Sequence, residues 1–322
     1  MSFAHYRSLG LLGILPCLLH AADQVQVAQN SSLPVFSQQG AISQNDLASR
    51  QSLQQDVIPK MPGDADYGEQ QIVTRRSNWE PWSVSADFSF NHDSNALLLH
   101  HRQLGDNYYK QGATISYTPQ IAGRLFGNFS FGYSNFNYDK LAKPLNFDLY
   151  NFDAGLIYLF PKEGTFLDNS SVFLRYGYYR ITDRFNWQGT KYDNHAIILG
   201  FQKNFLITKG QQAFIGLSSM WSFDSSVKEP RRNEHSLYAG YLFKWFYWLE
   251  SQIVYRGSLF DYTQASGRQD WNHTLTLGTD FKLTDWAKIS LNLGGTLNNS
   301  NKPSASYRNL NIGVSILFSK QF

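Results

Sequence analysis

Residues 311–322, NIGVSILFSKQF, form the stretch that decides the fold class of this chain. Apolar side chains recur at every second position from Ile312 to Phe318, and Gly313 and Ser315 lie between them. A period of two predicts a β-strand with one apolar face and one polar face. A tilted strand of about ten residues is long enough to cross the hydrocarbon layer of a membrane.

The same alternation runs back along the chain to Trp82. In the first segment Val84, Phe88 and Phe90 alternate with small polar residues such as Ser85. Comparable segments lie near residues 112–117, 129–134, 152–158, 172–178, 197–201, 215–217, 236–259, 274–282 and 289–294. With 236–259 counted as a hairpin, the pattern predicts about 12 strands.

Two classes of protein have strands of this kind: soluble β proteins and membrane barrels. Aromatic residues make up 16% of the chain and charged residues only 16%, which favours a barrel whose apolar face meets lipid. Closure of a barrel leaves no unpaired strand edge in lipid. We therefore predict an all-β fold, a transmembrane antiparallel up-and-down β-barrel of about 12 strands, over residues 81–322.

The first 80 residues lack this alternation. Residues 1–22 combine two basic side chains, a short apolar run and a final Ala-Ala, which is the layout of a secretory signal peptide. Residues 23–80 are rich in Gln and Ser and have little apolar surface, so they predict a mostly disordered periplasmic tether. Cleavage would remove Cys17, the only cysteine, so neither disulfides nor redox chemistry are expected.

Connections between the predicted strands alternate in length. TPQIAG, TKGQQ, KWFY and TDWA are short, although PKEGTFLDNS, in an equivalent place, is not. Between them lie longer polar stretches: LHHRQLGDN, NYDKLAKPLN, DRFNWQGTKYD, DSSVKEPRRNE, DYTQASGRQD and NSNKPSAS. Short periplasmic turns and long external loops are typical of bacterial outer-membrane barrels. An even number of strands then leaves the N- and C-termini of the barrel in the periplasm.

The closing segment NIGVSILFSKQF resembles the last strand of bacterial outer-membrane barrels, which the barrel-assembly machinery reads. The matching residues are the terminal Phe322 with Phe318, Ile316 and Val314, while Lys320 departs from the usual apolar choice. The resemblance implies a porin-like protein of the bacterial outer membrane. We expect the assembly machinery, outer-membrane lipid and lipopolysaccharide to be its partners.

A second resemblance lies in the stretch FNHDSNALLL, residues 90–99. The spacing of His92 and Ser94 is similar to that in lipid A deacylase and outer-membrane phospholipase A, where His and Ser act at the lipid-facing surface. The resemblance implies Ser94 as nucleophile, His92 as base and Asp106 or Asn107 as the group that orients His92. The other interpretation is that these are polar residues where a strand leaves the membrane. We favour that interpretation because the motif lies on the first strand.

The remaining histidines also lie at or beyond the predicted outer strand ends: His100, His101, His195, His235 and His273. A surface metal site or a pH sensor is one interpretation of this distribution. The adjacent pair His100–His101 has weak ligand spacing, and an interfacial girdle explains the others. We therefore expect neither a metal nor another cofactor.

Charged residues on the polar faces of the strands are predicted to line the barrel interior: Asp87, Asp93, Asp153, Arg175, Glu250, Arg256, Asp280 and Lys282. They predict either a salt-bridge network that fills a narrow barrel or a polar lumen that selects solutes. The formal net charge of +3 gives no reason to expect a nucleic-acid partner.

A porin-like channel for passive diffusion of small polar solutes is the function that this pattern favours. A lipid acyl hydrolase that uses His92 and Ser94, and a structural barrel without transport, are the alternatives. We expect the chain not to be an enzyme. A barrel by itself does not define an activity.

Overall fold

The computed structural model describes residues 80–322 except 102, 142–144, 161–164, 184–185, 209, 229 and 265–266. The predicted signal peptide and tether lie outside the described residues. No helix in the described part of the chain is long and apolar enough to cross a membrane.

The described chain is almost entirely β-strand. Its strands are β1 (Trp82–Asp93), β2 (Asp106–Tyr117), β3 (Gln120–Ala122), β4 (Leu125–Tyr138), β5 (Phe147–Leu159), β6 (Ser170–Asp183), β7 (Asn186–Thr208), β8 (Gln211–Ser225), β9 (Arg232–Phe246), β10 (Leu249–Tyr262), β11 (Gln269–Lys282), β12 (Ala287–Ser300) and β13 (Tyr307–Gln321). Without the three-residue β3, which lies in a turn, 12 long strands remain among the described residues. The predicted fold class and strand number are confirmed.

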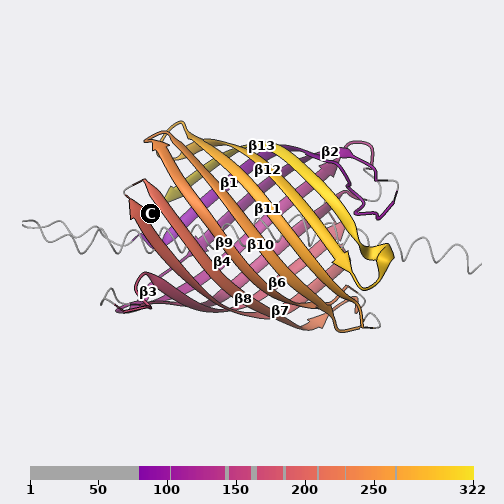
Figure 1. Ribbon diagram of the computed structural model, residues 1–322, viewed down its shortest axis with the longest axis horizontal. Coiled ribbons are helices and arrows are strands. Elements are labelled where there is room, and N and C mark those ends of the chain that lie inside the picture. Colours follow the sequence, from indigo (N-terminus) through magenta and orange to yellow (C-terminus); the bar gives the residue numbers. More distant parts are fainter. Residues whose placement is uncertain are drawn as a thin grey trace, which may run out of the picture.

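Each long strand pairs in antiparallel register with its neighbours in the sequence, and the first and last strands close the sheet. β1 pairs with β13 from Ser83↔Gln321 to Asp93↔Asn311 and with β2 on its other side, while β2 pairs with β4. The result is a closed barrel of tilted strands (Figure 1). Closure pairs the backbone N–H and C=O groups of the two edge strands. A lipid environment requires this pairing because hydrocarbon offers these groups no hydrogen-bond partner.

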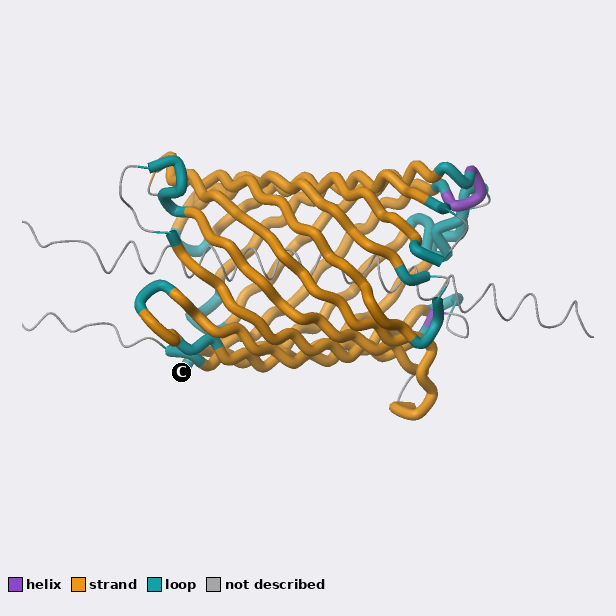
Figure 2. The backbone as a smooth tube through the Cα atoms, turned by 90° about the horizontal axis from the view of Figure 1, so that it is seen from below, coloured by secondary structure: helices purple, strands orange, loops and turns teal. Residues whose placement is uncertain are grey.

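The two ends of the barrel differ (Figure 2). At one end the backbone groups of Trp82 and Phe322 bond to each other, with N···O distances of 3.3 and 3.0 Å. Tight turns join β7 to β8, β9 to β10 and β11 to β12 at this turn end. Most of the longer connections, including the 3-10 turn η2 (Pro303–Ala305), lie at the opposite, loop end, while the longer connection from β5 to β6 lies at the turn end.

One predicted loop is in fact strand. The polar stretch DRFNWQGTKYD belongs largely to a β6–β7 hairpin, in which β7 has 23 residues and pairs with β6 as far as Asp183↔Asn186. This part of the hairpin extends beyond the ends of the other strands. Since it lies beyond the apolar zone, its side chains do not need to alternate between apolar and polar.

Candidate functional site

The outward face of the barrel is apolar on every long strand. Phe88 on β1, Leu174 on β6 and Leu217 on β8 are about half exposed, and similar side chains cover the other strands. Soluble monomers rarely expose apolar surface on this scale. This face therefore meets the hydrocarbon of a membrane.

Exposed tryptophans lie near both borders of this apolar surface. Trp82, Trp245, Trp248 and Trp286 lie toward the turn end, and Trp221 and Trp271 toward the loop end. Aromatic side chains of this kind anchor a barrel at the two membrane interfaces.

The inward face is polar, and much of its charge is paired across neighbouring strands. Asp87 accepts a hydrogen bond from the Lys110 ammonium at 2.9 Å, between β1 and β2. Asp280 lies 2.5 Å from the Lys288 ammonium, between β11 and β12. Glu250 on β10 is in register with Lys244 on one side and with the like charge of Asp280 on the other. Opposite charges on adjacent strands stabilise the sheet and neutralise the interior locally.

Lys282, the last residue of β11, differs from the other predicted lumen residues. Its side chain is 51% exposed, and its ammonium lies 2.8 Å from the Asp285 carboxylate in the β11–β12 turn. The hydrogen bond from Lys282 lowers the pKa of Asp285. The structure therefore places Lys282 at the turn-end rim.

Arg175 and Asp153 lie on the inward faces of β6 and β5 in the middle of the barrel wall. The Arg175 guanidinium carbon is 4.7 Å from the centre of the Phe173 ring, a cation–π contact. Asp153 accepts a long hydrogen bond of 3.5 Å from the Ser130 hydroxyl. No ion pair within 4.0 Å joins these two opposite charges in the described structure.

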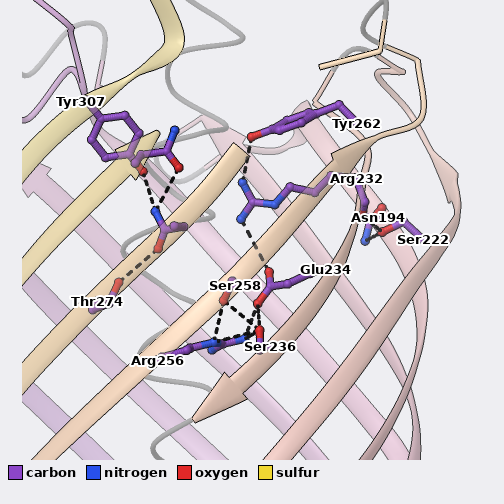
Figure 3. Close-up of polar contacts among 12 residues, drawn as sticks. Asn194, Ser222, Arg232, Glu234, Ser236, Arg256, Ser258, Tyr262, Thr274 and Tyr307 are labelled. Atoms are coloured by element: carbon purple, nitrogen blue, oxygen red, sulfur yellow. Dashed lines mark hydrogen bonds and ion pairs between the residues drawn. The ribbon is translucent and has the colours of Figure 1, made fainter. Parts of the chain in front are cut away.

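Nearer the loop end, β9 and β10 bring two arginines to one glutamate (Figure 3). Glu234 forms an ion pair with Arg256 and lies 3.8 Å from the Arg232 guanidinium. The Ser236 hydroxyl donates to Glu234 at 3.0 Å, and Arg256 Nε donates to Ser236 and Ser258 at 3.2 Å each. A buried carboxylate between two guanidinium groups is compensated for its lost hydration.

Arg232 is almost completely buried although it carries a full charge. Its guanidinium carbon lies 3.7 Å from the centre of the Phe260 ring, and Nη1 donates to the Tyr262 hydroxyl at 3.1 Å. Sequence analysis missed this residue and Glu234. The available signal was parity, because both share the inward face of β9 with Ser236 and Tyr238.

A polar ladder continues from this network across β11 to β13. Arg268 donates twice to Asp270, at 3.0 and 2.6 Å. Asn298 donates to Asp270 at 3.0 Å, and Asn272 donates to Asn298 at 3.2 Å and to the Tyr307 hydroxyl at 3.4 Å. These bonds connect side chains of the three strands β11, β12 and β13 near the loop end.

The sector from β2 to β7 is apolar at the same end. Tyr108, Phe136, Phe147, Leu149 and Ile181 form a buried cluster, and Ala96 and Leu145 of the loops pack against them. The interior therefore has an aromatic sector and a charged sector. Asp93 lies between them on β1, where it is buried and accepts from Asn309 at 2.5 Å.

The stretch at His92 and Ser94 is at the loop-end rim. His92 is exposed, and its Nδ1 lies 2.8 Å from Asn107 Oδ1 on β2. Ser94 follows the end of β1; its hydroxyl accepts from the Leu310 amide at 2.8 Å and donates to Asn309 at 3.2 Å. Across the described residues, no hydrogen bond joins the Ser94 hydroxyl to His92.

Asp106 is the first residue of β2, not part of a loop as the sequence indicated. Its carboxylate is buried and accepts from the amides of Asn107, Lys140 and Leu141 at 2.7–3.1 Å. Asp106 thus ties the first external loop to the second. The side chain that contacts His92 is Asn107.

The other strand histidines have similar partners on neighbouring strands. The Nδ1 atoms of His195, His235 and His273 lie 2.6–3.0 Å from the hydroxyls of Tyr176, Ser219 and Tyr255. His100 Nδ1 lies within hydrogen-bond distance of the Ser306 carbonyl, and the His101 ring packs on the His100 ring. Within the described ranges, no three His, Cys, Asp or Glu side chains are grouped as metal ligands.

The residues of the predicted insertion signal lie on the outward face of β13 and at the C-terminus. Val314, Ile316, Phe318 and Phe322 are all exposed. The Lys320 ammonium lies 5.6 Å from the centre of the Phe322 ring. A basic side chain at this position therefore shares the turn-end interface with the terminal ring.

Comparison with known proteins places this geometry in a fold class. No protein-family model and no curated protein matches the chain. Its structure is similar to the crystal structure of an outer-membrane channel from Pseudomonas putida F1, with a TM-score of 0.53, 9% identity, and coverage of 81% of this chain and 99% of that one.

The chain has the fold of an outer-membrane channel.

The KdgM porin is a more distant likeness, with a TM-score of 0.41, 11% identity, and coverage of 73% of this chain and 98% of that one. The NanC porin is similar at the same TM-score of 0.41, with 10% identity, and coverage of 72% of this chain and 98% of that one. The closed barrel of the described chain and its similarity to the Pseudomonas putida F1 channel confirm the predicted porin-like outer-membrane barrel at the level of fold.

Proposed function

We propose that this protein is a porin-like channel for passive diffusion of small polar solutes. The observation that carries the proposal is that the two faces of the barrel wall differ in polarity. Apolar side chains face outward on every long strand, whereas charged side chains lie on the inward faces from Asp280 and Lys288 near the turns to Arg232 near the loops. A polar interior inside an apolar shell is what a solute pathway requires.

The similar channel from Pseudomonas putida F1 supports the same function, since it shares the fold and is itself an outer-membrane channel. Lipid, lipopolysaccharide and the barrel-assembly machinery are the partners that such a protein would meet. Its interior polar groups suit solutes that form hydrogen bonds or carry charge.

Conductance in planar lipid bilayers tests the proposal. Purified barrel in 1 M KCl is expected to give stepwise current increases of uniform size, because each inserted barrel adds one aqueous path. The control is the same preparation unfolded by boiling, which should give none. Folded barrels, recognised by a heat-modifiable gel shift, that insert without conductance would contradict the channel and favour a structural role.

We further propose that the turn end, with both ends of the barrel, faces the periplasm and that the long loops face outward. Asn301 in the β12–β13 loop and Asp285 in the β11–β12 turn are both exposed and lie at opposite ends. In intact cells a membrane-impermeant maleimide should label Asn301→Cys but not Asp285→Cys. Both should be labelled after lysis, and the reverse pattern in cells would invert the orientation.

A further inference from the structure

Arg175 differs from five other cations on the inward faces or the loop-end rim of the barrel. Lys110, Arg232, Arg256, Arg268 and Lys288 each form an ion pair with an inward carboxylate. In the described structure no carboxylate lies within 4.0 Å of the Arg175 guanidinium, and its buried Nε has no hydrogen-bond partner. A guanidinium without a carboxylate partner is free to bind an external anion.

The surrounding wall holds the Arg175 side chain in place. Its guanidinium packs on the Phe173 ring, and its stem lies over Gly155 on β5. A Cβ at Gly155 would lie 2.2 Å from the Leu174 carbonyl oxygen and 2.7 Å from Arg175 Cγ, so glycine is needed for the close approach of both the β6 backbone and this stem. A guanidinium that is already ordered loses less entropy when it binds a ligand.

Neutral polar groups and a second arginine lie nearby. The Tyr238 hydroxyl on β9 donates to Gln202 on β7 at 3.3 Å. Arg175 from β6 and Arg256 from β10 both lie within electrostatic range of this hydroxyl. Arg256 is held in an ion pair with Glu234, whereas Arg175 has only Asp153 within electrostatic range and no ion pair within 4.0 Å in the described structure.

We propose that Arg175 holds the carboxylate of small organic acids during their passage through the barrel. The proposal rests on the channel function. A guanidinium presents two parallel N–H groups that match the two oxygens of a carboxylate. Such a bond is stronger inside a protein than in bulk water, because the effective dielectric constant there is lower. Binding at the paired cations would first require an internal ion pair to break.

Block of the KCl current by succinate tests this site. Wild-type channels should show a concentration-dependent reduction of chloride current. Arg175→Gln should need about tenfold more succinate for half block, since one charge-assisted contact contributes about 1.5 kcal/mol or more. Arg175→Lys should weaken the block less, because it keeps the charge but loses the paired N–H groups.

Lys110→Gln is the matched control, since it removes one inward positive charge that is already paired with Asp87. It should keep the wild-type block. If succinate blocks Arg175→Gln as strongly as wild type, the proposal is overturned. It is also overturned if Lys110→Gln weakens the block as much as Arg175→Gln does, because that would indicate a general effect of interior charge. Absence of current in all folded variants would instead contradict the channel function itself.

Discussion

Two glycines on the inward wall are fitted to aromatic rings on the facing strand. Gly216 on β8 is opposite Tyr238 on β9, and Phe214 is opposite Gly240 in the same ladder. A Cβ at Gly216 would lie 2.3 Å from the tip of the Tyr238 ring, and one at Gly240 would lie 2.3 Å from the tip of Phe214. Each ring therefore lies over a glycine instead of projecting across the interior.

Gly216→Ala is expected to lower the stability of the barrel by about 1–3 kcal/mol, because the methyl group displaces the Tyr238 ring. The measurement is the midpoint of thermal unfolding in detergent, followed by the heat-modifiable gel shift. Gly294→Ala is the control, since a Cβ there would have only the Thr276 hydroxyl at 4.0 Å. Equal midpoints for both variants would contradict the packing described.

Among the strands, the contact between β1 and β13 decides whether the sheet is a barrel. Their register runs over the whole length of β1 and places Ser85 opposite Ser319. The two strands lie at opposite ends of the described sequence, so their pairing is the one that closes the sheet on itself. The terminal strand is the part that resembles an assembly signal, which fits a closing role.

Cysteines at Ser85 and Ser319 test the seam. Facing residues of antiparallel strands have Cα atoms about 4.5–5.5 Å apart, which suits a disulfide. In a chain whose Cys17 is replaced, we expect Ser85→Cys with Ser319→Cys to oxidise and to migrate faster on a non-reducing denaturing gel. Ser315 faces Ser89, so Ser85→Cys with Ser315→Cys should not cross-link. Cross-linking of this second pair would show a different register.

At the scale of the whole molecule, the barrel wall separates two environments. Outside, Trp and Phe side chains mark both borders of an apolar belt. Inside, an aromatic sector and a charged sector face the interior near the loop end. The proposed channel function depends on this separation, and the proposed role of Arg175 depends on which charges the closed barrel leaves unpaired.

Much of the wall could be predicted from sequence because sidedness in a strand is local. The alternation around Phe88 and Phe90 indicates which face is apolar, and it assigns Asp87 to the other face. The hairpin at 183–193 escaped prediction because a polar strand outside the membrane has no such alternation. The sequence does not reveal Glu234 and Arg232 as inward residues, because the polar stretch DSSVKEPRRNE that contains them predicts a loop and not the start of β9.

The sequence by itself determined the all-β class, the number of long strands, the closing segment and the side of the wall for most predicted residues, since a period of two depends only on neighbouring positions. Only the tertiary structure decided the partners: Asp87 with Lys110, Glu234 with two arginines, Asn107 with His92. It also decided that Arg175 has no carboxylate partner among the described residues. The physical reason is that pairing depends on strand register and barrel closure, which join residues that are distant in the chain.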